Sequence, residues 1–366
     1  MQAQAAVLAA FDEPLELREI PLPCLEEGQV LVAIEAAGVC GSDVHMWRGR
    51  DPRTPIPMVL GHEGVGRIVE VRGPRTDISG RPLQPGMRVL WERSITCGTC
   101  YQCAVAHQPG LCPDRWVYGI HRALEQSLGP GGCYATHLIL DQRTALWHLS
   151  ETDDPAAYVA AGCSGATAAH AVELAGVQPG HTVVVLGPGP LGAYAAALAR
   201  QAGAEQVIVI GGTPERLGFC QRLGATHAVN RHESKVDARA EMIRDLTHGR
   251  GADAVIEASG SIAAANEALA LVAAGGSAAL AGFGTPVGAM SLLPFEDLVR
   301  RNVRLQGVWV SDARHTHTAL ALVRSAPALF GEMVTHRLPL REATRALELV
   351  EERVAAKAVI LPPAAA

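Results

Sequence analysis

Residues 181–212 read HTVVVLGPGPLGAYAAALARQAGAEQVIVIGG, and this stretch decides the fold. Two short apolar runs, at 182–186 and 206–210, flank an alanine-rich segment with the composition of a helix. Buried strands that alternate with helices in this way are typical of a parallel sheet. The stretch therefore predicts a strand, a crossover helix and a second, parallel strand.

The turn between the first strand and the helix has the pattern Gly-x-Gly-x-x-Gly. The first glycine permits a tight turn, the second lets a pyrophosphate approach the backbone, and the third allows close helix packing. A phosphate would then rest on the helix N-terminus. Glycines punctuate many turns, but in this strand-to-helix context the motif predicts dinucleotide binding. The turn consists of Gly187, Pro188, Gly189, Pro190, Leu191 and Gly192.

The same alternation continues toward the C-terminus and predicts a doubly wound parallel sheet. We expect further strands at 227–230, 253–258 and 277–282. The expected helices cover residues 190–202, 214–223, 237–248 and 261–273.

The end of the second strand carries no acidic residue. An Asp or Glu there would bind the ribose 2′-hydroxyl of NAD and repel the 2′-phosphate of NADP. The chain instead has Gly211, Gly212 and Thr213, so it tolerates either coenzyme, with a slight preference for NADP. Thr213 or Arg216 could contact the extra phosphate, although Arg216 could equally be an ordinary exposed helix residue.

The first 155 residues have a different pattern, in which short apolar runs are bounded by Gly and Pro. Such runs indicate short strands, so the residues alone predict an all-β region with irregular loops. The runs lie at 5–10, 15–23, 29–38, 66–71, 87–91 and 135–140.

Potential metal ligands stand on both sides of a proline-rich loop. Cys40 and His62 could supply two ligands of a catalytic zinc, which needs three protein ligands and one vacant position. Cys163, set among small residues, is the best candidate for the third, and Glu63 is a weaker alternative. Such a site could bind an alcohol oxygen and lower the pKa of its hydroxyl toward about 7. The ordinary alternative is two buried thiols and a core histidine.

A second group of cysteines predicts a closed, structural zinc site. Two-residue gaps bring successive sulfurs to a common centre, and four thiolates leave no vacant position. Disulfides or an iron–sulfur cluster are the alternatives. The gap before the last cysteine holds eight residues. The four are Cys97, Cys100, Cys103 and Cys112.

Several pieces of the sequence together resemble the zinc-containing medium-chain dehydrogenase/reductase family, the relatives of alcohol and sorbitol dehydrogenases. They occur in the family's order and close to its spacing, except that the gap before Cys112 is one residue longer than usual in the family. Cys112 is therefore the least certain of the four lobe ligands. The resemblance covers nearly the whole chain. The pieces are GVCGSDVH (38–45), GHEGVGRIVEV (61–71), CGTCYQC (97–103), GCSGATAAH (162–170) and VVVLGPGPLG (183–192).

The resemblance implies a fold of α/β class with two domains. Residues 1–155 and 300–366 would form a GroES-like β-rich catalytic domain, with the structural zinc lobe at about 95–115. Residues 156–299 would form the Rossmann dinucleotide-binding domain. In the returning segment we expect a final strand at 303–310, a helix at 343–352 and a closing strand at 357–363.

The resemblance also implies roles for single residues. Ser42 would take the proton of the substrate hydroxyl and relay it through the coenzyme ribose to His45, while Asp43 and Glu63 orient His62 or balance the metal. For Ser42 and His45, the plain alternatives are a loop hydrogen bond and an exposed histidine. Backbone near Phe283 and Val308 would meet the nicotinamide, and Lys357 would approach the pyrophosphate unless it is simply exposed. The substrate-pocket stretches contain Trp47, Trp91 and Arg93, although large aromatics often only pack.

These observations predict a zinc-dependent alcohol dehydrogenase or carbonyl reductase that uses NAD or NADP and two zinc ions per chain. A polyol or amino-alcohol dehydrogenase is the alternative, although sorbitol-type relatives often carry Glu in place of Cys163. A non-catalytic dinucleotide-binding protein is a third hypothesis, disfavoured because Cys40, His62 and Ser42 are all present.

Composition limits the partners. The 366 residues carry a net charge of −6 without a basic run, which argues against nucleic-acid binding. No apolar run reaches the roughly 18 residues of a membrane span, and no secretory signal begins the chain. Nine cysteines, partly at two-residue gaps, suit metal binding better than a disulfide framework. We therefore expect a cytoplasmic enzyme acting on a small molecule, and the resemblance implies a homodimer or homotetramer.

Overall fold

A computed structural model describes residues 1–363 of the chain. It divides into two compact units, each described here by itself. The first, the catalytic unit, comprises Met1–Cys163, Asp312–Thr316 and the chain from Val323 onward. The second, the coenzyme unit, comprises Ser164–Ser311 and His317–Leu322.

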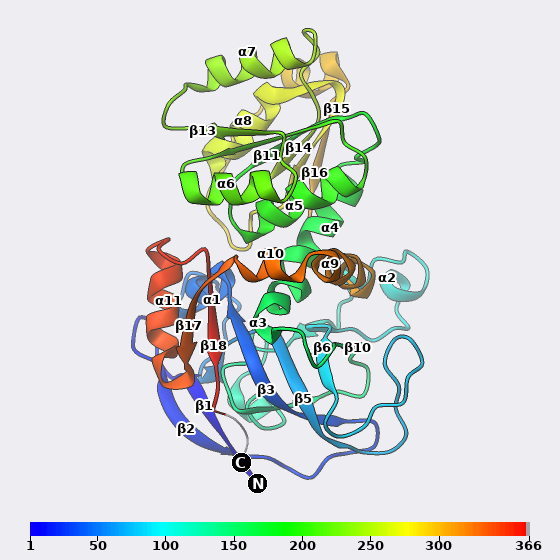
Figure 1. Ribbon diagram of the computed structural model, residues 1–366, viewed down its shortest axis with the longest axis vertical. Helices are drawn as coiled ribbons and strands as arrows, with labels where there is room; N and C mark the ends of the chain where they lie inside the picture. The colour runs from blue at the N-terminus through cyan, green and yellow to red at the C-terminus, as the bar shows by residue number, and fades with distance from the viewer. Residues whose placement is uncertain (364–366) are drawn as a thin grey trace. The chain divides into compact units, whose positions relative to one another are not determined.

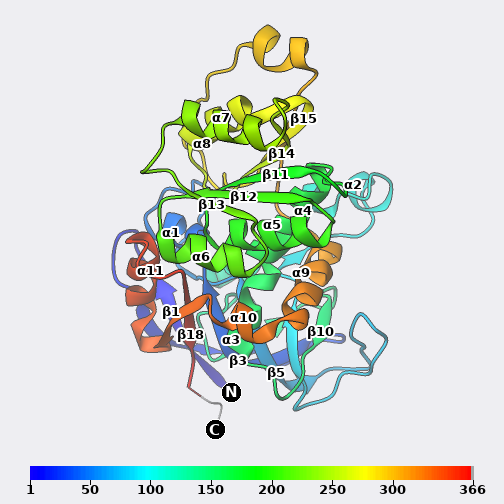
Figure 2. The same cartoon turned by 45° about the horizontal axis from the view of Figure 1, so that its top comes forward.

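The coenzyme unit is built on a six-stranded parallel sheet with the order β13–β12–β11–β14–β15–β16. Figures 1 and 2 show α5 and α6 on one face of this sheet and α7 and α8 on the other. The doubly wound sheet expected from the sequence is therefore confirmed. Its strands are β11 (Thr182–Leu186), β12 (Gln206–Gly211), β13 (His227–Asn230), β14 (Ala252–Glu257), β15 (Val272–Leu280) and β16 (Arg304–Gly307). Its helices are α4 (Ser164–Leu174), α5 (Pro190–Gln201), α6 (Pro214–Arg222), α7 (Val236–Leu246) and α8 (Ile262–Leu271).

The glycine-rich turn joins β11 to α5 because its glycines fit where side chains would not. Gly187 has a φ of +113°, a conformation that other residues rarely adopt. A side chain on Gly192 would collide with the carbonyl oxygen of Gly187. The helix can therefore start directly against the end of the strand, with Pro190 at its first position.

The catalytic unit contains a seven-stranded sheet in which β10–β6–β5–β3–β18–β17 follow one another and β9 also pairs with β3. A three-stranded sheet, β2–β1–β4, and a short β7–β8 pair complete it. Apolar side chains of these strands and of the helix at 343–351 form one core. The GroES-like β-rich domain is thereby confirmed.

The strands of this unit alternate with short helices and turns. Its strands are β1 (Gln2–Leu8), β2 (Glu16–Pro21), β3 (Val30–Val39), β4 (Met58–Val59), β5 (Glu63–Val71), β6 (Arg88–Trp91), β7 (Ser94–Ile95), β8 (Trp116–Val117), β9 (His137–Leu140), β10 (Leu146–His148), β17 (Val334–Pro339) and β18 (Lys357–Leu361). Its helices are α1 (Gly41–Trp47), α2 (Tyr101–Ala104), α3 (Pro155–Tyr158), α10 (Pro327–Gly331) and α11 (Ala343–Glu351), and α9 (Ala313–Ser325) has residues in both units.

The unit boundaries differ from the expected positions at 155 and 300. The first unit continues to Cys163, because α3 and the following 3-10 turn pack on β3 and β5. The run at 303–310, expected as a strand of the catalytic domain, instead provides β16, which pairs with β15 in the coenzyme sheet. By pairing with β15, β16 covers backbone groups that would otherwise be unpaired at the edge of the parallel sheet. The apolar run at 303–310 predicts a strand, but it does not by itself indicate which sheet that strand joins.

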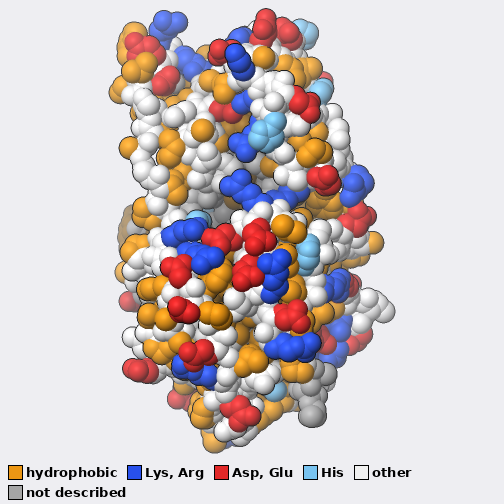
Figure 3. Space-filling model, turned by 90° about the vertical axis from the view of Figure 1, so that its left-hand side faces the viewer, with side chains coloured by type: hydrophobic (Ala, Val, Ile, Leu, Met, Phe, Trp, Pro, Cys, Tyr) orange, Lys and Arg blue, Asp and Glu red, His pale blue; other side chains and the backbone are white. Residues whose placement is uncertain are grey.

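Acidic and basic side chains are intermixed on the face drawn in Figure 3. None of the helices between residues 1 and 363 combines the length and the apolar character that a bilayer crossing requires.

Candidate active site and coenzyme site

The three proposed ligands of the catalytic zinc come together within the catalytic unit. Cys40 follows β3 and caps α1, and His62 immediately precedes β5, the antiparallel neighbour of β3. Cys163 ends the 3-10 turn that packs on these two strands. Ligand atoms of these residues and of Glu63 all lie within 4.8 Å of one another.

The distances between these ligand atoms suit a zinc ion. The sulfurs of Cys40 and Cys163 are 3.9 Å apart, and Nε2 of His62 lies 3.3 Å from the sulfur of Cys163. Zinc bonds of about 2.3 Å to sulfur and 2.0 Å to nitrogen, at a tetrahedral angle, place sulfur atoms about 3.8 Å apart and sulfur and nitrogen about 3.5 Å apart. His62 and Cys163 are buried and Cys40 is half-buried, so two thiolates and an imidazole form a shielded donor set.

Asp43 fixes the orientation of His62. Its Oδ1 lies 3.2 Å from Nδ1 of His62, while its Oδ2 accepts hydrogen bonds from the Cys40 backbone at 2.8 Å and from the Tyr134 hydroxyl at 3.1 Å. The carboxylate is fully buried. It therefore leaves Nε2 of His62 directed at the metal position, as a partner behind a metal-binding histidine commonly does.

Glu63 forms a buried ion pair with Lys357 behind the proposed ligands. Glu63 is 1% exposed and Lys357 is 2% exposed, and the lysine also donates to the carbonyl oxygen of Val39 at 3.0 Å. The alternative of a solvent-exposed Lys357 is therefore wrong. Its ammonium contacts the metal-site carboxylate, a partner that the resemblance to the family did not suggest.

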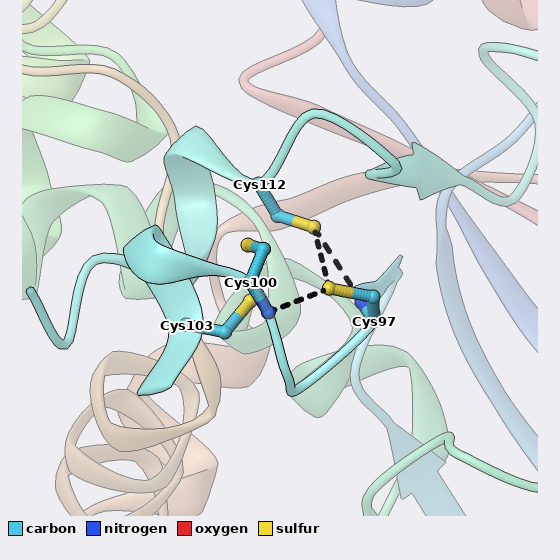
Figure 4. A group of neighbouring side chains, drawn as sticks. All are labelled: Cys97, Cys100, Cys103 and Cys112. Atoms are coloured by element: carbon cyan, nitrogen blue, oxygen red, sulfur yellow. Dashed lines mark hydrogen bonds between the residues drawn. The ribbon is translucent and has the colours of Figure 1, made fainter. Parts of the chain in front are cut away.

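The four cysteines of the expected structural lobe also converge (Figure 4). The sulfurs of Cys97 and Cys112 are 3.6 Å apart, close to the sulfur separation in a tetrahedral zinc site. The long gap before Cys112 contains α2 and a 3-10 turn, Pro109–Leu111, whose first carbonyl accepts the Cys112 backbone N–H at 3.0 Å. Cys112 thus lies in the cluster despite the long gap before it.

The coenzyme residues expected from the sequence lie at the ends of the central strands. Gly211 ends β12, and Thr213 caps α6 directly after it. Phe283 follows β15, and the backbone N–H of Val308 donates to the carbonyl of Leu280 at 3.0 Å. The carboxyl ends of parallel strands are where such sheets bind ligands.

Comparisons with known proteins agree with this geometry. Residues 26–151 match the family model of the alcohol dehydrogenase GroES-like domain, and residues 190–325 match that of zinc-binding dehydrogenases. The 5-exo-hydroxycamphor dehydrogenase of Pseudomonas putida is 31% identical, over 98% of this chain and 99% of its own length. The chain belongs to the zinc-containing medium-chain dehydrogenase/reductase family.

Solved structures of relatives lead to the same family. An alcohol dehydrogenase from Thermotoga maritima is 44% identical, with a TM-score of 0.94 over 99% of this chain and 100% of its own. A zinc-binding dehydrogenase from Sinorhizobium meliloti 1021 bound to NADP is 28% identical, with a TM-score of 0.85 over 99% and 100% of the two chains. The protein is thus a zinc-dependent oxidoreductase that interconverts an alcohol and an aldehyde or ketone by hydride transfer with NAD or NADP, as the sequence predicted.

Three residues expected to line the dehydrogenase's substrate pocket differ in their surroundings. Trp47 and Trp91 are buried members of the hydrophobic core, so both indoles pack inside the domain. Arg93 is 6% exposed, and its Nη1 donates to the sulfur of Cys163 at 2.8 Å. A positive charge beside the sulfur of Cys163 was not expected, because residues 70 positions apart in the sequence carry no signal of contact.

Two residues that the sequence did not suggest, Arg231 and His232, lie beside Gly211 and Gly212. The backbone N–H of Arg231 donates to the carbonyl of Gly211 at 2.8 Å, so the loop after β13 lies against the end of β12. A methyl group on Gly212 would stand 2.9 Å from Nε of Arg231 and 2.5 Å from Nε2 of His232. Arg231 and His232 directly follow the strand predicted at 227–230, next to the end of the second strand where the acidic residue is missing. That position was the available sequence signal for these two residues.

The side chains proposed as zinc ligands of the dehydrogenase must lose protons when the metal binds. A hydrogen bond from Cys163 is the main cause that holds the pKa of Cys40 well below its usual range, and the same bond raises the pKa of Cys163. Burial would lower the pKa of His62, but Asp43 and Cys40 raise it to about 10. At pH 7 the metal-free site therefore keeps the proton of the Cys163 thiol and a protonated His62 imidazolium.

We expect the zinc affinity of this site to rise with pH, by about a hundredfold per pH unit near neutrality. Zinc must displace one proton from His62 and one from Cys163, and both pKa values lie above 7 in the metal-free protein. Competition with a chelator at several pH values, while the cysteine lobe stays loaded, measures the slope. The Asp43→Asn variant should flatten it by lowering the pKa of His62, and a pH-independent affinity would contradict the proposed ligands.

Proposed function

We propose that the reaction takes place at a zinc ion bound by Cys40, His62 and Cys163, with a second, structural zinc bound by the four-cysteine lobe. The observation that carries this proposal is the convergence of two thiols and one imidazole, at zinc-compatible distances, from three separate segments. When bound, zinc supplies a Lewis acid for the substrate oxygen and the nicotinamide supplies the hydride carrier. Asp43 and Glu63 orient His62 and balance charge at the site.

Ser42 and His45 are placed to move the hydroxyl proton. Both lie on α1, three positions apart, and therefore on one face of the helix. The hydroxyl oxygen of Ser42 is 3.9 Å from the sulfur of Cys40, beside the metal position. Burial, and to a lesser extent Arg50, lower the pKa of His45, so its imidazole is neutral at pH 7 and can accept a proton.

An alcohol dehydrogenase is favoured over a polyol dehydrogenase because Cys163 supplies a thiol where sorbitol-type relatives often carry a carboxylate. An amino-alcohol substrate is the second candidate. It is supported by the L-threonine 3-dehydrogenase of Chelativorans sp. (strain BNC1), which is 29% identical over 92% of both chains.

NADP is the proposed coenzyme. Its phosphates would lie on the turn Gly187–Gly192, and its 2′-phosphate would meet Gly211, Gly212 and Thr213, where no carboxylate repels it. Arg231 is exposed and lies next to Gly212, so its guanidinium could bind that phosphate. His232 could supply a second hydrogen-bond donor. Bidentate pairing of arginine with phosphate is among the stronger charge-assisted contacts.

Replacing Arg231 with alanine should lower kcat/KM for NADP by about 10- to 100-fold, because a hydrogen bond to a charged group contributes about 1.5–3 kcal/mol. The efficiency with NAD, which lacks the 2′-phosphate, should change little. Steady-state kinetics with both coenzymes measures the effect, with Arg216→Ala as the comparison and Arg345→Ala, in the catalytic unit, as the control. If Arg216→Ala alone discriminates between the coenzymes, Arg231 is not the phosphate ligand.

We also propose a homodimer or homotetramer in the cytoplasm. In the segment 287–299, Val287, Leu293, Phe295 and Val299 are 46–65% exposed, and nearby β16 is an edge strand. Apolar side chains so exposed favour contact with a second copy of the chain. No cysteine within the described residues forms a disulfide, which is consistent with a reducing compartment.

The decisive experiment is a screen of alcohols and ketones, monitored at the absorbance of the reduced nicotinamide with NAD and NADP, together with a zinc count. Turnover with two zinc ions per chain supports the proposal. A single zinc per fully active chain would remove the structural site, and no turnover by zinc-loaded protein with either coenzyme would remove the function.

A further inference from the structure

Cationic side chains from three segments gather beside the metal site. Arg93 follows β6 and donates to the proposed ligand Cys163. Arg115 precedes β8, His121 follows it, and Arg53 lies in the proline-rich loop. These four residues, three arginines and a histidine, form a basic cluster.

Hydrogen bonds tie the three segments together. Arg115 donates from Nη2 to the hydroxyl of Ser94 at 3.0 Å, and the backbone of Tyr118 donates to the carbonyl of Arg93 at 3.1 Å. The backbone of Leu124 donates to the carbonyl of Pro57, at the end of the loop that carries Arg53, at 2.8 Å. The cluster is therefore part of the rigid β-rich domain.

One arginine of the cluster forms no direct ion pair with a carboxylate among residues 1–363. Arg53 pairs with the buried Asp51 at 2.7 Å, and Arg93 lies next to Glu92 and the Cys163 sulfur. Arg115 forms no ion pair within residues 1–363, and its only side-chain hydrogen bond in that part of the chain goes to the neutral hydroxyl of Ser94. Arg115 is half-buried, and Glu92 and Cys112 attract it electrostatically without forming a hydrogen bond to it, so a bound anion could pair with its guanidinium directly.

Three nitrogen atoms of the cluster are buried without a hydrogen-bond partner among the described residues: Nε of Arg93, Nε of Arg115 and Nδ1 of His121. Burial, and then the like charge of Arg93, lower the pKa of Arg115 to about 10, so the guanidinium stays charged at pH 7. Burial together with Arg115 and Arg53 lowers the pKa of His121 to about 4, which leaves a neutral imidazole able to donate one hydrogen bond. Buried polar atoms that lack a protein partner bind ordered water or a ligand, so these nitrogen atoms are available to a polar group of the substrate.

We propose that the substrate alcohol carries an anionic group, a carboxylate or a phosphate, which Arg115 and His121 bind while the hydroxyl occupies the metal site. This inference rests on the proposed function and narrows its substrate class to hydroxy acids or phosphorylated alcohols. It also gives Arg93 a role in shielding the negative charge of the substrate from the Cys163 thiolate.

The test compares three compounds on one scaffold: 4-hydroxycyclohexanecarboxylate, its neutral methyl ester, and 4-hydroxycyclohexyl phosphate. The zinc-loaded protein should prefer a charged compound over the ester by about 10- to 100-fold in kcat/KM, mainly through KM, because charge-assisted hydrogen bonds are involved. The preferred compound identifies the anion as carboxylate or phosphate.

Variants locate the binding group. Arg115→Met should bring the ratio of charged to neutral efficiency close to one, and His121→Leu should reduce it several-fold. Arg18→Met, which removes a surface arginine paired with Glu16, is the control and should leave the ratio unchanged. A zinc count on each variant is needed because the backbone of Arg115 donates to the carbonyl of Cys112, a lobe ligand, at 3.1 Å.

Two results would overturn the inference without touching the proposed function. One is equal efficiency for the ester and both charged compounds. The other is an Arg115→Met variant that loses the lobe zinc while keeping the wild-type ratio, which would make Arg115 a counter-charge for the four thiolates. If neither these compounds nor the neutral alcohols of the screen are turned over, the proposed function itself fails.

Discussion

Replacing Cys163 with alanine should reduce alcohol turnover by at least about 10³-fold, which corresponds to about 4 kcal/mol of transition-state stabilisation. The variant removes one of the two thiolates, which leaves zinc with Cys40 and His62 and no third thiol within reach. The side chain is small and buried, so the fold should survive. Steady-state kinetics measures the turnover, metal analysis measures the zinc content, and circular dichroism checks that the variant is folded.

Cys220→Ala is the matched control, because Cys220 is a fully buried cysteine of the coenzyme unit, outside both cysteine clusters. It should keep both zinc ions and full activity. Full activity in Cys163→Ala would refute the ligand assignment. If Glu63 replaced the lost thiolate, the variant would retain its zinc, and only the additional change Glu63→Gln would release it.

Replacing Lys357 with methionine should destabilise the catalytic unit by about 3–5 kcal/mol, the usual effect of removing one partner from a buried ion pair. The substitution leaves the carboxylate of Glu63, 1% exposed, without its counter-charge, and leaves the carbonyl of Val39 without its donor. Chemical denaturation of the zinc-loaded protein measures the change.

The double variant Lys357→Met/Glu63→Gln distinguishes the effect of losing the ion pair from the cost of leaving one buried charge without its counter-charge. It should recover much of the stability, because no isolated carboxylate remains buried. The single variant Glu63→Gln completes the cycle. If Lys357→Met instead raised KM for the coenzyme and left stability unchanged, Lys357 would serve the pyrophosphate, as the resemblance to the family implied.

The two metal groups show how differently a sequence can encode a site. The lobe cysteines Cys97, Cys100 and Cys103 lie within a short segment of the sequence, and their spacing directly predicts a shared metal centre. Cys163 is 123 positions from Cys40, and only its small neighbours and the family resemblance favoured it. Its sulfur reaches the site because the turn before it packs on β3 and β5.

The sequence by itself determined the parallel sheet, the dinucleotide turn and the cysteine lobe. Each of these depends on periodicity or on spacing within about thirty residues, and local backbone geometry follows from such patterns. The strand at 304–307 marks the limit, because its apolar pattern predicted a strand but not the sheet that it joins.

Tertiary structure alone decided the partners of the buried charges. Lys357 meets the carbonyl of Val39 across 318 positions because β18 pairs with β3, and Arg93 meets Cys163 because two loops close on the same strands. A charged residue in a sequence looks the same whether it will be exposed or paired. Its partner is chosen by long-range strand pairing and by the cost of leaving a charge unpaired in the interior, and neither is written in the neighbouring residues.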